Sequence, residues 1–331
     1  MKAKYDFKEL QKLIEAHQSF FIISHIYTDG DALGSILALK LYLQRLGKKV
    51  EAVVPGKIPA QYAFLGVHQH INRMNETQTL QFIEQADVIF ILDISALQRM
   101  DRWYKPVMQS RSLKVCLDHH PEGCADVDWQ IVDVQRIATA EIIYDFFKAN
   151  GVELNKEMAL ALYTAILTDS GSFRFEGTST FTLRMAAELT RYGIDPAWVY
   201  RKVYEHSNKA QLRFWGHVLT HLQSEGTIDW AVVPKSTLQK FGVTIEDMNG
   251  LVDIIRRDAT ATIFVMFVEN SNSEIMVGLR SKDNFDVGAI ARSFGGGGHF
   301  HAAGFSSSKP MDVVVQETLQ AIKEKQNGKQ A

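Results

Sequence analysis

Aspartate and histidine side chains recur in this sequence where apolar stretches end. The first stretch, residues 20–23, leads into a histidine and two aspartates, and the next two end in an aspartate and in an Asp-His-His run. A later helix-like stretch ends in another aspartate. The residues concerned are His25, Asp29, Asp31, Asp93, Asp118, His119, His120 and Asp169. Strands that end in acids and imidazoles deliver them to one edge of a sheet, where open α/β folds bind ligands.

Each of these residues also has a purely structural interpretation. Asp29 or Asp31 could cap a helix or form a turn, and Asp118 could simply end a strand. The combination favours a metal site, because gathered carboxylates and imidazoles would repel their like neighbours or stay half-desolvated unless a cation lay among them. Oxygen and nitrogen ligands without thiolate suit manganese, and less specifically zinc, iron or magnesium. Two such ions, roughly 3.5–4 Å apart, are a known arrangement for hydrolysing phosphate esters.

A glycine run at 295–298 is the second chemical signal, and His299 follows it directly. Glycines let backbone N–H groups approach an anion closely, and a histidine adds a donor. We interpret this run as a phosphate or substrate site rather than a flexible linker. Arg280, which ends an apolar stretch, is a candidate forked ligand for phosphate, although an ordinary exposed arginine would fit the same pattern.

Alternating strands and helices are expected over residues 1–190. Strands are predicted at 20–23, 50–54, 87–92, 113–117 and 129–132, and helices after residue 33 and over 139–149 and 155–168. Continuous apolar strands between helices predict an α/β fold with a doubly wound, mainly parallel sheet.

The pattern becomes more charged and helical over 191–215, which we interpret as a helical linker. From residue 216 the chain changes character. Strands are predicted at 231–233, 263–268 and 275–279, and helices at 287–294 and 311–325. These elements predict a smaller α/β domain over 216–331.

The bulk properties limit the possible functions. A chain of 331 residues with 46% hydrophobic content can bury a core for two domains. A net charge of −2 argues against a long basic track for nucleic acid. Cys116 lies in an apolar stretch and is expected to be a buried small hydrophobe, so no disulfide framework is implied. Without an apparent signal peptide or membrane span, we expect a cytoplasmic protein with no membrane partner.

The motifs resemble those of the DHH phosphoesterases, in family order, from about residue 15 to 320. Residues 25–31 resemble the first motif, Asp93 the second, residues 118–120 the third and name-giving one, and Asp169 the fourth. The run from Gly296 to His299, followed by Ala302-Ala303-Gly304, resembles the signature of the DHH-associated C-terminal domain. Gly295 is one glycine more than that signature has.

This resemblance implies two divalent metal ions, manganese above others. It assigns one ion to His25, Asp29 and Asp93, and the other to Asp31, Asp93, His119 and Asp169. Asp93 would bridge the ions, His120 would face the scissile phosphate, and Asp118 would orient a histidine. His120 and Asp93 are thus the candidate catalytic residues. The implied substrate-binding residues are Arg99, Arg280, Gly296, Gly297, Gly298 and His299.

The implied architecture is a DHH metal-binding domain at 1–190 and a substrate-binding domain at 216–331, with the active site in the cleft between them. The layout resembles the nano-RNase type of this family. Such enzymes hydrolyse short oligoribonucleotides to mononucleotides and 3′-phosphoadenosine 5′-phosphate to AMP, so the expected partner is short single-stranded RNA or a nucleotide.

Several alternatives stay open. They are a phosphodiesterase for linear or cyclic dinucleotides, an exopolyphosphatase or pyrophosphatase, and a homodimeric assembly. A non-enzymatic nucleotide-binding regulator is disfavoured, because it would need the loss of a metal ligand and every expected ligand is present.

Overall fold

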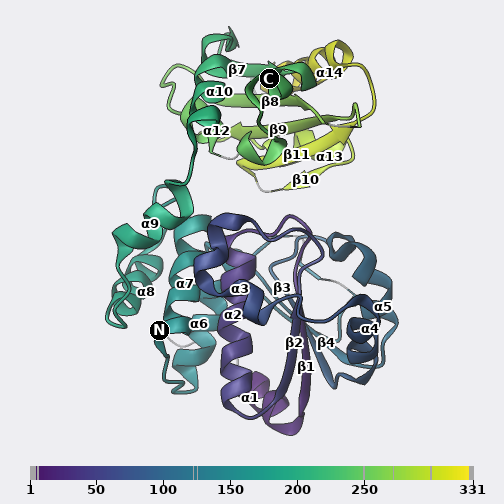
Figure 1. The fold of residues 1–331 in the computed structure, drawn as a ribbon, viewed down its shortest axis with the longest axis vertical. Coiled ribbons are helices and arrows are strands. Elements are labelled where there is room, and N and C mark those ends of the chain that lie inside the picture. The colour runs from purple at the N-terminus through teal and green to yellow at the C-terminus, as the bar shows by residue number, and fades with distance from the viewer. Residues whose placement is uncertain are drawn as a thin grey trace. The chain divides into compact units, whose positions relative to one another are not determined.

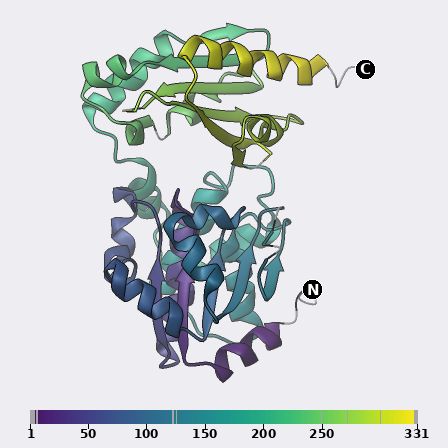
Figure 2. The ribbon, with the colours of Figure 1, turned by 90° about the vertical axis from the view of Figure 1, so that its right-hand side faces the viewer.

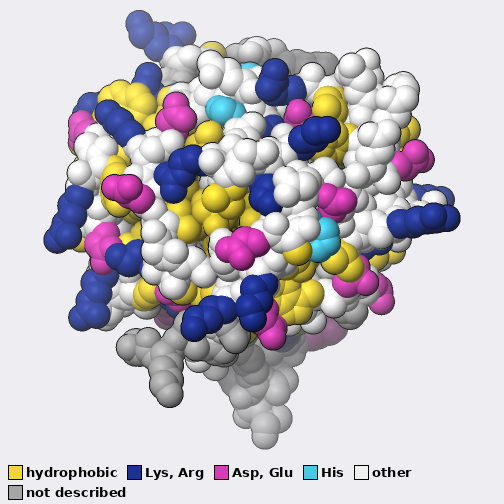
Figure 3. All heavy atoms as spheres, turned by 90° about the horizontal axis from the view of Figure 1, so that it is seen from below, with side chains coloured by type: hydrophobic (Ala, Val, Ile, Leu, Met, Phe, Trp, Pro, Cys, Tyr) yellow, Lys and Arg dark blue, Asp and Glu magenta, His cyan; other side chains and the backbone are white. Residues whose placement is uncertain are grey.

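The computed structural model describes residues 5, 7–121, 123–124, 126–248, 250–270, 272–298 and 300–327, without the side chains of Glu246 and Asp253. The chain divides into two compact units, residues 1–206 and 207–331, which are described separately. None of the described helices is long and apolar enough to cross a membrane. On the face drawn in Figure 3, acidic and basic side chains are interspersed with apolar ones.

A parallel sheet forms the centre of the first unit (Figure 1). Its strands are β1 (Ser19–Ile23), β2 (Lys49–Val53), β3 (Val88–Leu92), β4 (Leu113–Asp118) and β5 (Trp129–Val132), in the order β2-β1-β3-β4-β5. Every pairing in it is parallel. The prediction of a doubly wound parallel sheet is therefore confirmed, and the strand order reverses between β1 and β3.

Helices cover both faces of this sheet, with α2, α6 and α7 on one side and α4 and α5 on the other (Figure 1). The bounds are α1 (Phe7–Ala16), α2 (Gly30–Arg45), α3 (Val67–His70), α4 (Glu76–Gln85), α5 (Tyr104–Gln109), α6 (Thr139–Ala149), α7 (Lys156–Asp169), α8 (Thr180–Thr190) and α9 (Pro196–Tyr204), with 3₁₀ helices η1 (Ala60–Leu65) and η2 (Leu97–Trp103).

The strands are apolar throughout because each of their faces meets a core. Phe20 and Ile22 pack into the core on the α2 side, whereas Phe21 and Ile23 pack into the core on the α4 side. Successive strand residues point to opposite faces, so a strand covered on both sides reads as one unbroken apolar run.

The second unit contains a mixed sheet in which β7 and β8 are parallel and the other pairings are antiparallel. Its elements are α10 (Lys209–Thr220), β6 (Gln223–Glu225), β7 (Ile228–Val233), α11 (Lys235–Phe241), η3 (Ile245–Met248), α12 (Leu251–Ile255), β8 (Ile263–Glu269), β9 (Ile275–Ser281), α13 (Val287–Ser293), β10 (Gly297–Gly298), β11 (Ala302–Ser307) and α14 (Met311–Asn327). The strand order is β10-β11-β9-β8-β7-β6. In Figure 2 the yellow helix α14 lies along this sheet, where its apolar side joins a core with α13.

The expected separate linker over 191–215 differs from the structure, which divides the chain between residues 206 and 207. Val199 and Val203 of α9 are buried in the core of the first unit. Phe214 and Val218 of α10 are buried in the core of the second unit. Helix α9 is therefore part of the first unit and α10 is part of the second. In each helix a short apolar stripe packs into the core, although the exposed side is charged.

Candidate metal centre

The carboxyl ends of three parallel strands bring the acids and histidines of the first unit together. The segment after β1 carries His25 and Asp29, Asp93 follows β3, and His119 follows β4. The order β2-β1-β3-β4-β5 makes these three strands neighbours, so their carboxyl ends share one edge. The last residue of α7, Asp169, reaches the same place, since its carboxylate lies 3.3 Å from His119 Nε2.

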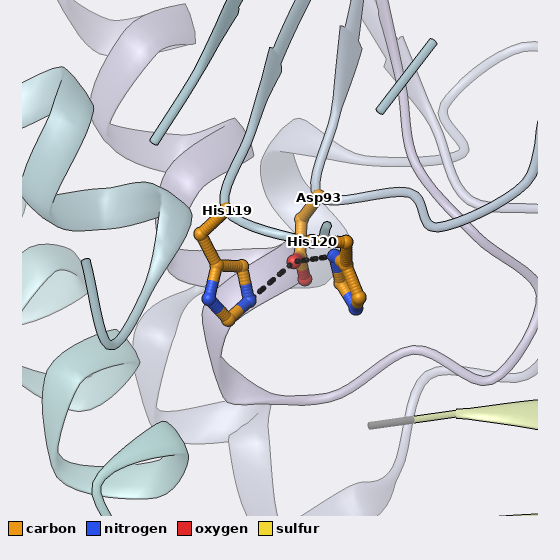
Figure 4. Close-up of side chains that lie close together, drawn as sticks. All are labelled: Asp93, His119 and His120. Atoms are coloured by element: carbon orange, nitrogen blue, oxygen red, sulfur yellow. Dashed lines mark ion pairs between the residues drawn. The ribbon is translucent and has the colours of Figure 1, made fainter. Parts of the chain in front are cut away.

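Asp93 lies at the middle of this cluster (Figure 4). Its Oδ2 is 3.5 Å from His25 Nε2, and its Oδ1 is 3.4 Å from His119 Nε2. Its two carboxylate oxygens thus face different histidines, which is the arrangement a bridging carboxylate needs. Oδ1 is also 3.7 Å from His120 Nδ1. The backbone of Asp93 has a φ of 54°, a left-handed conformation that aspartate tolerates better than most residues.

The candidate ligand atoms form overlapping groups in which all atoms lie within 4.8 Å of one another. These groups are His25, Asp29 and Asp93; Asp31, His119 and Asp169; and Asp93, His119 and His120. The seven residues are therefore one continuous cluster, joined through Asp93 and His119.

Asp29 and Asp31 also cap helices, so the structural interpretation holds for both alongside their place in the cluster. Asp29 Oδ1 accepts a hydrogen bond from Ala32 N at the start of α2. Asp31 accepts hydrogen bonds from the backbone N–H groups of Thr139 (2.6 Å) and Ala140 (3.0 Å) at the start of α6. These bonds, together with one that Ser35 Oγ donates to Asp31 Oδ1 at 3.1 Å, hold both carboxylates in fixed orientations. Asp31 Oδ2, which accepts one hydrogen bond from Thr139 N, keeps a second lone pair for a cation.

Close packing of α2 against α7 places Asp31 near Asp169. A Cβ at Gly30 would lie 2.3 Å from Thr168 Oγ1, and one at Gly34 would lie 2.3 Å from the Ala161 carbonyl oxygen. Only glycine fits at these two positions while the helices stay at this separation.

Two acids of the cluster, Asp31 and Asp169, have strongly raised pKa values. Burial raises the pKa of Asp31 well above its ordinary value, and the charge of Asp93 raises it further. Burial likewise raises the pKa of Asp169 well above its ordinary value, with Asp31 as the next cause. Carboxylates in this position hold protons unless another positive charge replaces them.

For His119 and Asp93, in contrast, interactions with neighbouring side chains outweigh burial and favour the charged forms. Burial disfavours the charged form of Asp93, but hydrogen bonds from His119 and His25 outweigh it and hold its pKa well below the ordinary value. Burial also acts against charged His119, yet the hydrogen bond with Asp93 and the charge of Asp169 raise the pKa of His119 well above the ordinary value. Protons on the histidines therefore take the place that a cation would fill.

Thr139 contacts two acids of the cluster, which the sequence did not predict. Its hydroxyl donates to Asp93 Oδ1 at 3.3 Å while its backbone N–H donates to Asp31, and the residue is fully buried. The Arg136 carbonyl oxygen, 3.3 Å from His119 Nδ1, is a second such contact, since it leaves Nε2 to face Asp93. The only local signal for Thr139 was its place at the start of a helical pattern.

Arg99 lies beside the segment that follows β1. Its guanidinium is 5.8 Å from the ring centre of Tyr27, and its carbonyl oxygen accepts a hydrogen bond from Ile26 N. Burial and, to a smaller extent, the charge of Arg99 act to lower the pKa of His25, but the hydrogen bond with Asp93 and the charge of Asp29 raise it overall. Tyr27 itself is 69% exposed, which is unusual for a large aromatic side chain.

The predicted substrate residues of the second unit lie on neighbouring strands of its sheet. Arg280 of β9 is in register with Ala302 of β11, and Gly298 of β10 is in register with Ala303. His299 lies outside the described residues.

The last two residues of the glycine run pair with β11 as an edge strand. A Cβ at Gly296 would lie 2.2 Å from the Gly304 carbonyl oxygen, so packing alone requires that glycine. Gly295 has a φ of 78°, a left-handed conformation that favours glycine, so a bound ligand is not needed to explain a glycine here. A Cβ at Gly297 would meet no described atom within 4 Å, so neither packing nor φ requires this glycine.

The donor set of the first unit fits divalent cations. Imidazole nitrogens and carboxylate oxygens converge in groups whose atoms lie within 4.8 Å of one another, and the raised pKa values of two acids indicate a deficit of positive charge. Such a mixture of ligands suits manganese, iron or zinc.

Comparison with known proteins gives consistent matches. A family model described as the DHH family, N-terminal domain, matches residues 19–166, and one described as the DHHA1 domain matches residues 231–328. The bifunctional oligoribonuclease and PAP phosphatase NrnA of Thermus thermophilus is 28% identical over 323 residues, covering 96% of this chain and 92% of its own. The protein of the same name from Bacillus subtilis is 28% identical over 303 residues, covering 90% and 92%. The crystal structure of an exopolyphosphatase-related protein from Bacteroides fragilis matches with a TM-score of 0.91 at 28% identity, covering 96% of this chain and 95% of that chain.

Proposed function

The chain belongs to the DHH family and is a phosphoesterase, and we propose that it hydrolyses short oligoribonucleotides to mononucleotides and 3′-phosphoadenosine 5′-phosphate to AMP. Two relatives matched over nine-tenths or more of this chain carry these two activities in their names. The observation that carries the proposal is the convergence of seven acid and histidine side chains at one edge of the parallel sheet.

We propose that these residues hold two divalent ions, manganese above others. His25, Asp29 and Asp93 would hold one ion. Asp31, Asp93, His119 and Asp169 would hold the other. Ions bound there supply activation of water and neutralisation of the charge that develops on the phosphate oxygens.

His120 and Asp118 have a separate part in the proposed reaction. Asp118 Oδ1 accepts a hydrogen bond from His120 Nδ1 at 2.7 Å, which fixes the proton on Nδ1. His120 Nε2 is then the ring atom that can accept a proton or, once protonated, donate to a phosphate oxygen. The carboxylate thus orients the His120 ring in the same way that carboxylates orient histidines in other sites.

Tyr27 favours a nucleotide over an inorganic phosphate chain as substrate. It is exposed and lies between the candidate ligands His25 and Asp29 in sequence. Bases stack on exposed aromatic rings, whereas polyphosphate has no group that would do so. We further propose that Arg99, Arg280, Gly297 and His299 contact the substrate; Gly296 and Gly298 then support the β10 edge.

The test is turnover by the full chain loaded with Mn²⁺, assayed on di- to pentaribonucleotides, 3′-phosphoadenosine 5′-phosphate and polyphosphate. We expect hydrolysis of the first two classes and loss of it after chelation. Turnover of polyphosphate alone would show that the protein is a polyphosphatase and would contradict the proposed function. Binding of nucleotides without turnover by fully loaded protein would indicate a regulator instead.

Polyphosphate hydrolysis is the second candidate, because the structurally similar Bacteroides fragilis protein is called exopolyphosphatase-related. It would use the same metal residues and would not need Tyr27. Comparing the two substrates with a Tyr27 variant therefore separates the candidates.

A further inference from the structure

Two cysteines and an aspartate form a second cluster of potential ligands. The sulfur atoms of Cys116 and Cys124 and a carboxylate oxygen of Asp118 lie within 4.8 Å of one another. The three residues are at most 1% exposed. Because the chain contains only two cysteines, both of its thiols are at this one place.

The fold brings these donors together from separate segments. Cys116 and Asp118 are two positions apart on β4 and so point to the same face of the sheet. Gln130 of β5 is in register with Cys116, and its side-chain oxygen accepts a hydrogen bond from Cys124 N at 3.0 Å. The neighbouring strand thus fixes Cys124 over Cys116.

Asp118 supplies an independent sign that a partner belongs here. Its Oδ1 accepts hydrogen bonds from His120 Nδ1 and His119 N, at 2.7 and 2.9 Å. Its Oδ2 is buried and receives no hydrogen bond from any described residue. A buried carboxylate oxygen without a donor or cation is costly, and such atoms require an explanation.

A disulfide is the less favoured explanation for the thiol pair. The hydrogen bond with Cys124, followed by burial, raises the pKa of the Cys116 thiol and keeps it protonated. Oxidation needs an accessible thiolate, and both sulfurs are shielded from solvent. A disulfide would also leave Asp118 Oδ2 without a partner.

We propose that Cys116, Cys124 and Asp118 bind a thiophilic divalent cation of the zinc type, separate from the centre at Asp93. The Ile94 carbonyl oxygen, 3.8 Å from Cys124 Sγ, is the fourth donor. Binding replaces the two thiol protons, which are released to solvent, so that two thiolates and one carboxylate face the ion. Thiolates select zinc over manganese, and closed four-donor sites of this kind are structural.

This cation would act on the candidate catalytic histidine through Asp118. One oxygen of that carboxylate would bind the ion while the other holds His120 Nδ1. Ile94 directly follows Asp93, so the ion would also tie the ends of β3 and β4 together. Asp118 would then be held from both sides, as are the outer carboxylates that orient histidines in metal sites.

The test uses the full chain, reduced and freed of metal, titrated with Co²⁺ as the spectroscopic probe. A thiolate-to-cobalt charge-transfer band in the near ultraviolet reports on the two cysteines alone, whatever cobalt binds at the histidine cluster. We expect a band that saturates at one ion per chain and disappears on addition of Zn²⁺. Cys116→Ser and Cys124→Ser should each remove or strongly weaken it, while Ser112→Ala, at another buried polar position, should leave it unchanged.

A second measurement, made on the unaltered protein, tests the proposal even if the cysteine variants fail to fold. In the unaltered protein, Zn²⁺ should protect both thiols from alkylation, and a chelator should restore their labelling. The proposal is overturned if cobalt binds without a thiolate band, or if Zn²⁺ leaves labelling unchanged. It is also overturned if the protein isolated without reductant has both thiols joined in a disulfide. None of these outcomes depends on the proposed enzymatic activity.

Discussion

Asp118 Oδ1 lies 2.7 Å from His120 Nδ1, and both side chains are buried. This contact predicts the effect of Asp118→Asn, which keeps the size of the side chain and removes its charge. His120 loses the carboxylate that orients its ring and holds the proton on Nδ1, so kcat should fall by roughly 10- to 100-fold, the usual effect of losing such a partner. Steady-state kinetics on a dinucleotide measures the loss.

The matched control is Asp312→Asn, which makes the same change at an exposed position of α14. It should leave kcat unchanged. An Asp118→Asn enzyme with wild-type kcat and a full complement of metal would show that the contact has no part in catalysis.

Asp93→Asn tests the bridging carboxylate without disturbing the backbone. Asparagine tolerates the left-handed φ of 54° at this position, whereas alanine would add strain. Because Asp93 faces both His25 and His119, we expect both bound ions to be weakened and activity to fall by more than about 100-fold. Elemental analysis of the folded variant gives the metal content. A variant that keeps two ions per chain would contradict the bridging assignment.

The strand ends were predictable because an unbroken apolar run that stops at an acid is a strong local signal. The places of Asp93 after β3 and His119 after β4 can be predicted from that pattern alone. Thr139 was not predictable, because its contacts with Asp31 and Asp93 depend on how α6 meets two other segments. A lone threonine at the start of a helix has no feature that distinguishes this use from an ordinary one.

The second unit was less predictable for a related reason. The strand β11 (Ala302–Ser307) has small residues and a glycine, which have low strand propensity. It forms because β9 offers it a full edge of backbone partners from Ile275 to Arg280. Tertiary pairing of this kind leaves little trace in the local sequence.

Gly34→Ala tests whether the packing of α2 on α7 supports the cluster. The added methyl group would lie 2.3 Å from the Ala161 carbonyl oxygen, so the two helices must separate. The free energy of unfolding should fall by about 1–3 kcal/mol, as overpacking usually costs. Metal affinity should fall as well, because Asp31 and Asp169 lie on the two helices. Thermal unfolding and metal titration measure the two effects.

Gly216→Ala is the control, because this exposed helical glycine of α10 has no described atom near its missing Cβ. That change should stabilise the protein by about 0.5–1 kcal/mol through helix propensity. If both variants are equally stable and bind metal equally well, the close approach of α2 and α7 is not needed.

The raised pKa values predict how metal-free protein responds to pH. Asp31, Asp169 and His119 bind their protons more firmly in the folded chain than in the unfolded chain. The folded state therefore holds more protons, and its stability falls as pH rises through the raised pKa values, from the weakly acidic range upward. Asp93, with its lowered pKa, acts in the opposite sense only below the ordinary pKa of aspartate.

Metal binding displaces these protons, so the increase in Tm that Mn²⁺ produces should grow as pH rises. Calorimetry with and without Mn²⁺ over a pH series measures that increase. Asp169→Asn, which removes one of the three groups, should flatten the dependence. An increase in Tm that is the same at every pH would show that these protons are not linked to the metal.

Tyr27 provides the prediction that separates nucleotide from inorganic substrates. Its ring is 69% exposed, and Arg99 lies 5.8 Å from its centre, so one face of the ring is supported by a cation. Stacking of a base on an aromatic ring contributes roughly 1–3 kcal/mol. Tyr27→Ala should therefore raise KM for a dinucleotide by about 5- to 150-fold, while Tyr27→Phe, which keeps the ring, should be close to wild type.

Turnover of polyphosphate and the metal content should not change in Tyr27→Ala, because neither depends on stacking. Tyr200→Ala removes another exposed tyrosine, on α9, and should leave all substrates unaffected. If Tyr27→Ala slows hydrolysis of the dinucleotide and of polyphosphate equally, Tyr27 acts through the neighbouring candidate ligands His25 and Asp29. An unchanged KM for the dinucleotide would mean that the base binds elsewhere, and the preference for nucleotides would then have to come from the second unit.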